Sequence, residues 1–294
     1  MTRPKTYRVG SAEVTRIPEL RLDGFTPAAL LPDWPEHDGA PARHRPDCFT
    51  PDGGRVLLSV HSWLIRDRGR TILVDAGAGN DKQRPHARYF DRLRNPYLDQ
   101  LTAAGVTPEA VDYVLLSHLH VDHVGWNTRL VDGEWVPTFP NARYLFSRRE
   151  YEFFCDPANR SERNRTSIQA RLDSVDPVVA AGLADPIEVD GREVMPGLSF
   201  HPTPGHSPDH ASIVLQRDGE RAIFAGDVLH DPVQVERPDL ISIFDADPEA
   251  TLRSRQWALG YAADADATFF ASHFPSTAAG RVVRDGNGFA WHFE

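Results

Sequence analysis

Residues Ser117 to Trp126, SHLHVDHVGW, place three histidines and an aspartate close together. The apolar stretch VDYVLL comes directly before them and predicts a buried strand. Strands usually end on residues such as glycine, asparagine or proline, which turn the chain at little energetic cost. Bulky polar side chains beside a core strand lower stability unless they gain a partner. Because imidazole nitrogen and carboxylate oxygen are the ligands of catalytic divalent metals, the cluster predicts a metal site.

The chain has ordinary globular composition, with 294 residues, 40% hydrophobic and 25% charged. Predicted strands and helices interleave without a linker or repeat, so we expect one α/β domain over residues 1–294, with two packed sheets covered by helices. A proline-rich stretch over about residues 18–54 lacks periodicity. Its apolar anchors favour an ordered lid or pocket segment, and a dimer contact or a disordered tether are the alternatives.

Local patterns predict the individual elements. We expect a first hairpin in TYRVGSAEVTRI and a second one turning at Asp67–Gly69. Helical spacing covers residues 86–104, with Asn95-Pro96 as an interruption, and a capping box at Ser147 begins another helix. The remaining expected elements are a helix over 162–181, strands at LSFHPTP, ASIVLQ, RAIFAGD and ATFFAS, a helix over 248–263, and a closing hairpin around 285–288.

Charge and composition exclude several classes of partner. The formal net charge of −10 disfavours binding to nucleic-acid phosphates. The two cysteines, Cys48 and Cys155, lack the spacing of a zinc finger or a disulfide framework. There is no apolar segment long enough for a signal sequence or a membrane span. We therefore expect a cytoplasmic protein with neither a nucleic-acid nor a membrane partner, and a homodimer remains open.

Further metal-competent residues follow three later strands. His206 comes after a Pro-Gly turn, and Asp227 and His273 each end an apolar strand. One ion cannot comfortably take all four ligands of the short cluster, whereas two adjacent ions can share them with these three residues. Such a pair would hold a shared hydroxide, the arrangement of two-metal hydrolases. The histidines outside this set are expected to be structural: His61, His86, His201 and His292.

With these positions, the chain resembles the metallo-β-lactamase-fold hydrolase superfamily. HLHVDH matches the family signature HxHxDH, and the family order continues through LVDAG, TPGHSPDH, AGD and ASH, so that the resemblance spans roughly residues 55–273. It implies a four-layer αβ/βα sandwich of two mixed sheets packed face to face, with helices outside. It also implies two sets of metal ligands that share one bridging carboxylate: His118, His120 and His206 for one ion, Asp122, His123 and His273 for the other, and Asp227 between them. Asp75 and His210 would orient these ligands.

One position separates branches of the family. The acyl-homoserine lactonases place a tyrosine three residues after the bridging aspartate, whereas this chain has His230 there, in GDVLH. The pattern is closer to GDLxH, which methyl-parathion-hydrolase-like enzymes and related lactonases share. Specificity is not inherited with the fold, because one fold hosts many reactions.

The expected activity is hydrolysis of an ester bond, most plausibly in a lactone or an aryl ester, by a hydroxide that bridges two divalent ions. The ions are expected to be zinc, with manganese, iron or cobalt as alternatives. Asp122 would take and return a proton, and His230 would donate a hydrogen bond to the carbonyl or leaving oxygen; a structural role for His230 is equally open. Hydrolysis of an organophosphate triester or a phosphodiester is the alternative reaction, and a non-catalytic metal-binding scaffold is a third reading.

A small hydrophobic ester or lactone would need an apolar pocket. Several aromatic residues are candidates for its wall: Trp126, Phe25, Trp34, Phe49, Trp63 and Phe244. The sequence leaves the natural substrate, the native metal and the oligomeric state open.

Overall fold

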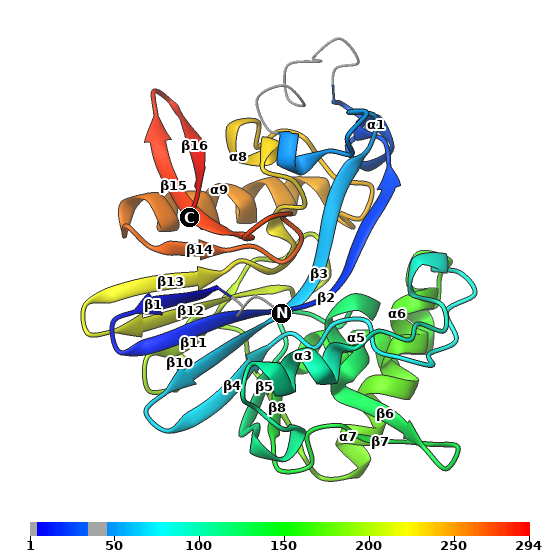
Figure 1. Cartoon of the computed structure of the whole chain (residues 1–294). Coiled ribbons are helices and arrows are strands. Elements are labelled where there is room, and N and C mark those ends of the chain that lie inside the picture. Colours follow the sequence, from blue (N-terminus) through cyan, green and yellow to red (C-terminus); the bar gives the residue numbers. More distant parts are fainter. Residues whose placement is uncertain (1–4, 35–45) are drawn as a thin grey trace. The chain divides into compact units, whose positions relative to one another are not determined.

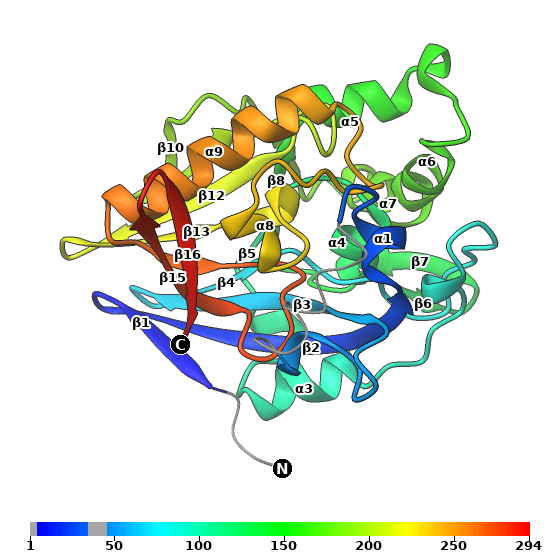
Figure 2. The same cartoon turned by 90° about the horizontal axis from the view of Figure 1, so that it is seen from above.

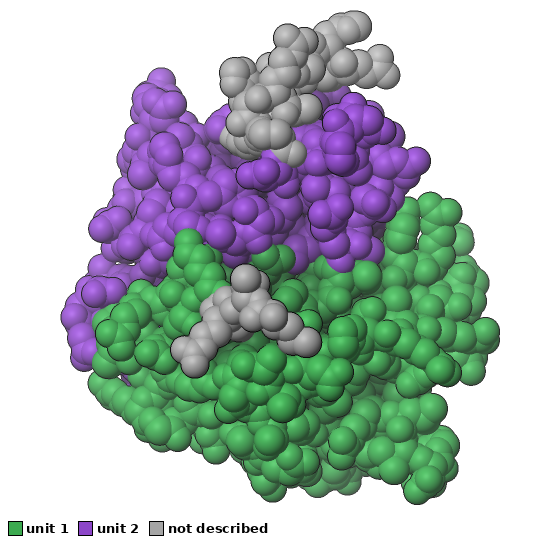
Figure 3. Space-filling model, viewed as in Figure 1, with its two compact units in different colours: residues 1–20, 60–188 green, residues 21–59, 189–294 purple. Residues whose placement is uncertain are grey.

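The computed structural model describes residues 5–34 and 46–294. Their contacts divide the chain into two compact units, which Figure 3 colours separately: residues 1–20 with 60–188, and residues 21–59 with 189–294. The elements form two mixed sheets with helices, which confirms the predicted α/β class. No helix among the described residues is both long and apolar enough to cross a membrane.

The first sheet has the strand order β1-β2-β3-β4-β5-β8-β9 (Figure 1). It is antiparallel between β3 and β4 and parallel from β4 through β9. Its strands are β1 (Thr6–Val9), β2 (Ala12–Phe25), β3 (Val56–Asp67), β4 (Arg70–Val74), β5 (Tyr113–Leu115), β8 (Arg143–Ser147) and β9 (Ala184–Ile187). β3 is buried along almost its whole length, including its two serines and its histidine.

Helices and a small hairpin complete the first unit. The helices are α3 (Tyr97–Ala103), α4 (Val121–Val124), α5 (Arg148–Cys155), α6 (Arg165–Ala170) and α7 (Asp176–Ala180); the hairpin joins β6 (Thr128–Val131) to β7 (Glu134–Pro137). Helix α5 packs on β8 and β9. Tyr97 and Leu101 of α3 join Leu64, Leu73 and Val114 in the buried apolar core of this unit.

The second sheet has the order β10-β11-β12-β13-β14-β15-β16. Its strands are β10 (Glu193–Met195), β11 (Leu198–Pro202), β12 (Ala211–Arg217), β13 (Glu220–Phe224), β14 (Thr268–Phe270), β15 (Ala279–Asp285) and β16 (Gly288–Phe293). Only β13 and β14 are parallel, because the long helix α9 (Pro248–Asp264) lies in the crossover between them and packs against the sheet (Figure 2). Two short helices, α1 (Pro27–Leu30) and α8 (Val233–Glu236), belong to the same unit.

Most of the locally predicted elements are confirmed. β1 and β2 pair as the first hairpin, β3 and β4 as the second, and β15 and β16 as the closing one. The hydroxyl of Ser147 accepts a hydrogen bond from the Glu150 amide at 3.0 Å and caps α5. The helix expected over 162–181 exists, but a π-helical turn at Arg171–Val175 interrupts it.

Two local predictions were wrong. The helix expected over residues 86–104 is confined to α3, because a proline at position 96 disfavours helical conformation in the residue before it. The earlier part of that range contains only a short 3₁₀ turn, Arg88–Phe90. Residues 18–25, expected to begin a long loop, instead continue strand β2. The described pairing of β1 with β2 ends at Thr15, before Pro18. Residues 35–45 of the expected loop lie outside the described residues.

Candidate metal centre

The histidine cluster of the first unit begins directly after β5. His118 and His120 follow the strand, His120 in extended conformation directly before α4, and Asp122 and His123 lie in α4. The ring centroids of His118 and His120 are 4.5 Å apart, and those of His118 and His123 are 4.1 Å apart. The four side chains that the sequence singled out therefore gather at one end of a core strand.

Asp75 holds two parts of this cluster in place. Its carboxylate accepts hydrogen bonds from the Ser117 amide at 2.8 Å and from the Ser117 hydroxyl at 2.8 Å, and it lies 2.9 Å from Nδ1 of His123. This contact leaves Nε2 as the metal-binding nitrogen of His123. Asp75 itself has a left-handed backbone, φ 58°, an uncommon conformation for a residue with a side chain. Such local strain is typical of functional sites.

Glu150 is a supporting residue that the sequence did not single out for the site. It is fully buried, and its Oε1 accepts a hydrogen bond from the Leu119 amide at 2.8 Å. Leu119 lies between His118 and His120, so Glu150 fixes the backbone that carries both. Its position in the capping box was the only sequence signal.

The second unit contains the other predicted ligands. Asp227 follows β13, His273 follows β14, and His206 lies between β11 and β12. Oδ2 of Asp227 lies 2.9 Å from Nε2 of His273, 3.3 Å from Nε2 of His206 and 3.6 Å from Nε2 of His230. Three imidazole nitrogens therefore face one buried carboxylate oxygen.

Hydrogen bonds within the second unit hold these ligand candidates in place. The Nδ1 atom of His273 lies 2.9 Å from the carbonyl oxygen of Ser59. Nε2 of His210 accepts a hydrogen bond from the Asp227 amide at 2.8 Å, while Nδ1 lies 2.9 Å from the Thr203 hydroxyl. His210 thus fixes the backbone of the predicted bridging residue, and its ring packs edge to face on that of His206 at 5.9 Å.

Asp245 orients His206 and was not predicted from the sequence. Its Oδ1 lies 3.3 Å from Nδ1 of His206, and its Oδ2 accepts a hydrogen bond from the Ser242 amide at 2.9 Å. The buried guanidinium of Arg255 lies 3.4 Å from the same Oδ2. Burial raises the pKa of Asp245. No local pattern distinguishes Asp245 from the other acidic residues nearby, so the sequence held no signal for it.

His230 lies among the ligand candidates of the second unit. It is 1% exposed, and neither ring nitrogen forms a hydrogen bond within the described residues. Burial lowers the pKa of His230 to about 3, which keeps the imidazole neutral near pH 7. Its ring stacks on that of His273, with centroids 5.4 Å apart. Asp227, His230 and His273 together could hold a metal ion, as could His206, His230 and Asp245.

The predicted aromatic residues fall into separate groups. Phe25 and Phe244 pack edge to face at 5.7 Å, and the ring of His230 lies 5.5 Å from Phe244. Trp34 and Phe49 form a buried pair at 6.0 Å in the same unit.

The other two tryptophans belong to the first unit. Trp63 is buried against Tyr7, and Trp126 stacks on Tyr97 at 5.1 Å. Their place in a substrate pocket stays a prediction.

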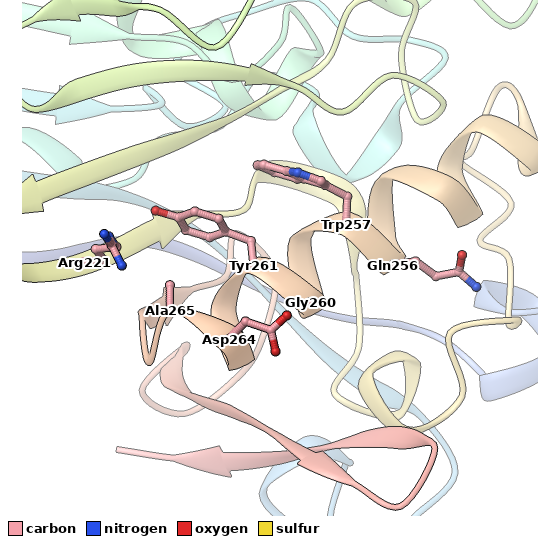
Figure 4. Close-up of a pocket in the computed structure, with 7 residues that line it drawn as sticks. All are labelled: Arg221, Gln256, Trp257, Gly260, Tyr261, Asp264 and Ala265. Carbon is pink, nitrogen blue, oxygen red and sulfur yellow. The ribbon is translucent and has the colours of Figure 1, made fainter.

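A hollow of about 460 Å³ lies beside α9, next to Arg221 of β13 (Figure 4). It is lined by Arg221, Gln256, Trp257, Gly260, Tyr261, Asp264 and Ala265. None of the residues predicted for the site lines it.

The donor sets fit divalent metal ions. Both units supply imidazoles held by hydrogen-bond acceptors at the second ring nitrogen, and the second unit adds a carboxylate oxygen facing three Nε2 atoms. Outer partners of this kind fix the tautomer of a metal-binding histidine. Imidazole and carboxylate together suit zinc and other transition metals.

Comparison with known proteins places the chain in a family. The sequence profile of the metallo-β-lactamase superfamily matches residues 55–273. The N-acyl homoserine lactonase AttM of Rhizobium radiobacter is 30% identical over 237 residues, which cover 76% of this chain and 85% of AttM. An N-acyl homoserine lactonase of Bacillus cereus is also 30% identical, but the match covers 56% of this chain and only 62% of the relative.

Solved structures show the same fold. The hydrolase AbOPH of the β-lactamase superfamily is 27% identical and superposes with a TM-score of 0.83, covering 100% of this chain and 99% of AbOPH. AidC, described as a dizinc quorum-quenching lactonase, is 20% identical with a TM-score of 0.78, covering 99% of this chain and 97% of AidC. With the profile match over most of its length and His/Asp clusters suited to metal, the chain belongs to the metallo-β-lactamase superfamily of metal-dependent hydrolases.

Proposed function

We propose that the protein is a dinuclear metal-dependent hydrolase that cleaves an ester bond, in a lactone or an aryl ester. The observation that carries the proposal is the buried Oδ2 of Asp227, which faces the Nε2 atoms of two proposed ligands, His206 and His273. A buried carboxylate surrounded by imidazoles is well suited to sharing a cation with them. The relatives named as N-acyl homoserine lactonases support a lactone as the substrate.

The proposed ligand set is the one that the family resemblance implies. It consists of His118, His120 and His206 for one ion, Asp122, His123 and His273 for the other, and Asp227 for both. Two bound divalent ions would acidify a water molecule and polarise the carbonyl oxygen of the ester. We propose zinc as the native metal, since its preferred ligands are those of this set.

The chain's own groups would then orient the reactants and move protons. The carboxylate of Asp122 would take the proton released during attack and return it to the leaving oxygen. His230, kept neutral by burial, has one N–H with which to donate a hydrogen bond to the carbonyl or leaving oxygen. Asp75 and His210 would hold His123 and Asp227 in position through the contacts described above.

An aromatic group next to His230 supports an apolar substrate. Phe244 contacts both His230 and Phe25, and it is 37% exposed. Its exposed ring can cover an acyl chain or an aryl leaving group beside the polar groups that act on the ester.

Elemental analysis and a substrate panel on one preparation test the proposal. We expect about two transition-metal ions per chain and the highest kcat/KM on γ- or δ-lactones or on aryl esters. Faster turnover of an aryl phosphotriester than of every lactone and ester would show that the protein is a phosphotriesterase instead. Less than one ion per chain, with no hydrolysis after zinc, manganese or cobalt loading, would show a non-catalytic scaffold.

A further inference from the structure

Glu19, on strand β2, has a carboxylate that accepts three hydrogen bonds. Its Oε2 accepts from the Ala78 amide at 2.7 Å, and its Oε1 accepts from the Gly79 amide at 3.0 Å and from the indole Nε1–H of Trp126 at 2.7 Å. The donors come from two segments far apart in the sequence, the one after β4 and the one after α4. A single side chain therefore bridges these two segments.

The two segments are also in direct backbone contact. The Ala76 amide donates to the His123 carbonyl at 2.7 Å, and the Trp126 amide donates to the Ala76 carbonyl at 2.7 Å. A Cβ atom on Gly125 would lie 1.9 Å from the carbonyl group of Ala78, so only glycine permits this approach. Glu19 therefore binds at a place where the two backbones touch directly, with no side chain between them.

Both segments carry residues of the candidate metal centre. Asp75 precedes Ala76 and contacts Nδ1 of His123, while Asp122 and His123 lie directly before the segment that contains Trp126. Trp126 is further held by its stacking on Tyr97. A shift of either segment would consequently displace the side chains of Asp122 and His123.

The chemistry around Glu19 requires a carboxylate. All three partners are N–H donors, so each needs an acceptor. Glutamine has only one acceptor oxygen, and its amide group would turn an N–H towards one of these donors. Burial raises the pKa of Glu19 to about 7, while hydrogen bonding by Ala78, Trp126, Gly79 and the Asn95 side chain lowers it. A buried carboxylate at this position lowers the stability of the fold. A role in positioning the two segments explains why it is there.

We propose that Glu19 is a positioning residue of the candidate metal centre, which sets metal affinity by holding the segment after Asp75 against the segment after His123. The inference rests on the proposed function, because it assigns Asp122 and His123 to a metal ion. Glu19 does not itself contact a predicted ligand side chain in the described hydrogen bonds.

The test compares Glu19→Gln with Glu13→Gln, a control on the same strand whose carboxylate makes an exposed pair with Arg8. Zinc affinity is measured by competition with a chromophoric chelator, and amide hydrogen exchange is measured on the metal-free proteins. We expect Glu19→Gln to weaken zinc binding about 10- to 100-fold, the usual range for outer-sphere partners, and to speed exchange in residues 76–79 and 124–126. Glu13→Gln should match the wild type in both measurements.

Trp126→Phe is the second variant, which keeps the stacking on Tyr97 but removes one donor. It should weaken zinc binding by a smaller factor and should have no further effect in the Glu19→Gln background. If folded Glu19→Gln binds zinc as tightly as the wild type, the inference is wrong. If Glu19→Gln does not fold, wild-type zinc affinity in Trp126→Phe overturns the inference instead. Because zinc binding needs no substrate, a protein that binds zinc but hydrolyses no ester would contradict the proposed activity and leave this test decisive.

Discussion

At Asp227, one carboxylate oxygen lies within 2.9–3.6 Å of three imidazole nitrogens. The Asp227 amide donates to His210, and Nδ1 of His273 lies 2.9 Å from the Ser59 carbonyl oxygen, so the chain's own groups hold both residues. Preorganisation of this kind lowers the cost of metal binding.

Replacing Asp227 with alanine should remove the bridging ligand. We expect metal content to fall from about two ions per chain to one or fewer and kcat/KM to fall more than about 100-fold, beyond the usual effect of an outer-sphere change. Mass-spectrometric metal analysis and ester turnover check this. Asp239→Asn, which alters an exposed pair with Arg237, is the control. Retention of two ions by the alanine variant would show that Asp227 does not bridge.

His230 should matter for turnover and not for metal content. His230→Phe keeps the ring volume next to Phe244 but removes the N–H donor, and losing one hydrogen bond to a developing charge should lower kcat about 10- to 100-fold. Metal analysis and steady-state kinetics on the same sample separate the two roles. A fall in metal content would identify His230 as a ligand, as its grouping with Asp227 and His273 permits.

At the scale of elements, a buried cation joins three parts of the first unit. Lys82 follows β4, and its Nζ lies 2.5 Å from the Thr128 hydroxyl in β6 and 3.1 Å from the Asp173 carbonyl in the π-helical turn. Arg84 forms a bidentate pair with the Asp173 carboxylate. The π-helical turn in the helix over 162–181 thus presents Asp173 to two buried cations.

The stability of this junction should depend on pH. Burial lowers the pKa of Lys82 to about 7, so between about pH 7 and 10.5 the unfolded chain binds more protons than the folded one. The free energy of unfolding contributed by Lys82 should therefore rise with pH across this window, by at most about 1.4 kcal/mol per pH unit.

Urea denaturation at pH 7 and pH 9.5 measures this contribution. Lys82→Met should lack the gain in stability that the wild type shows between the two values, whereas Lys5→Met, at an exposed position, should keep it. Equal gains in wild type and Lys82→Met would mean that Lys82 is already charged in the folded protein.

For the molecule as a whole, the proposed ligands come from both compact units: four from the unit of residues 1–20 and 60–188, and three from the unit of residues 21–59 and 189–294. Metal ions that bind only the folded state raise its stability by mass action.

Removing metal should consequently lower thermal stability. An ion at about 1,000 times its Kd contributes about 4 kcal/mol, which corresponds to a Tm change of roughly 10 °C for a protein of this size. Calorimetry before and after dialysis against a chelator, followed by zinc addition, checks the loss and its recovery. The Tm of Asp227→Ala should rise less on zinc addition. If chelation leaves the wild-type Tm unchanged, the folded protein does not bind metal as proposed.

Several features of the protein were readable from local sequence. The alternation of strands and helices, the cap at Ser147 and the start of α3 after Pro96 depend on residues close in the chain. The cluster from His118 to His123 was also evident, because its residues are nearly consecutive and unusual beside a core strand. Local patterns failed at residues 18–25, which continue strand β2 as part of a seven-stranded sheet although Pro18 favours a loop.

The type of fold, the family and the candidate metal ligands can be predicted from the residues in their order along the chain. The side chains that hold those ligands become visible only in the folded molecule: Asp245 behind His206, Glu150 behind Leu119, and Glu19 across the segments after Asp75 and His123. The physical reason is that a carboxylate can support the site only where hydrogen-bond donors surround it. Packing brings those donors together from distant parts of the chain, so no periodicity or spacing records them.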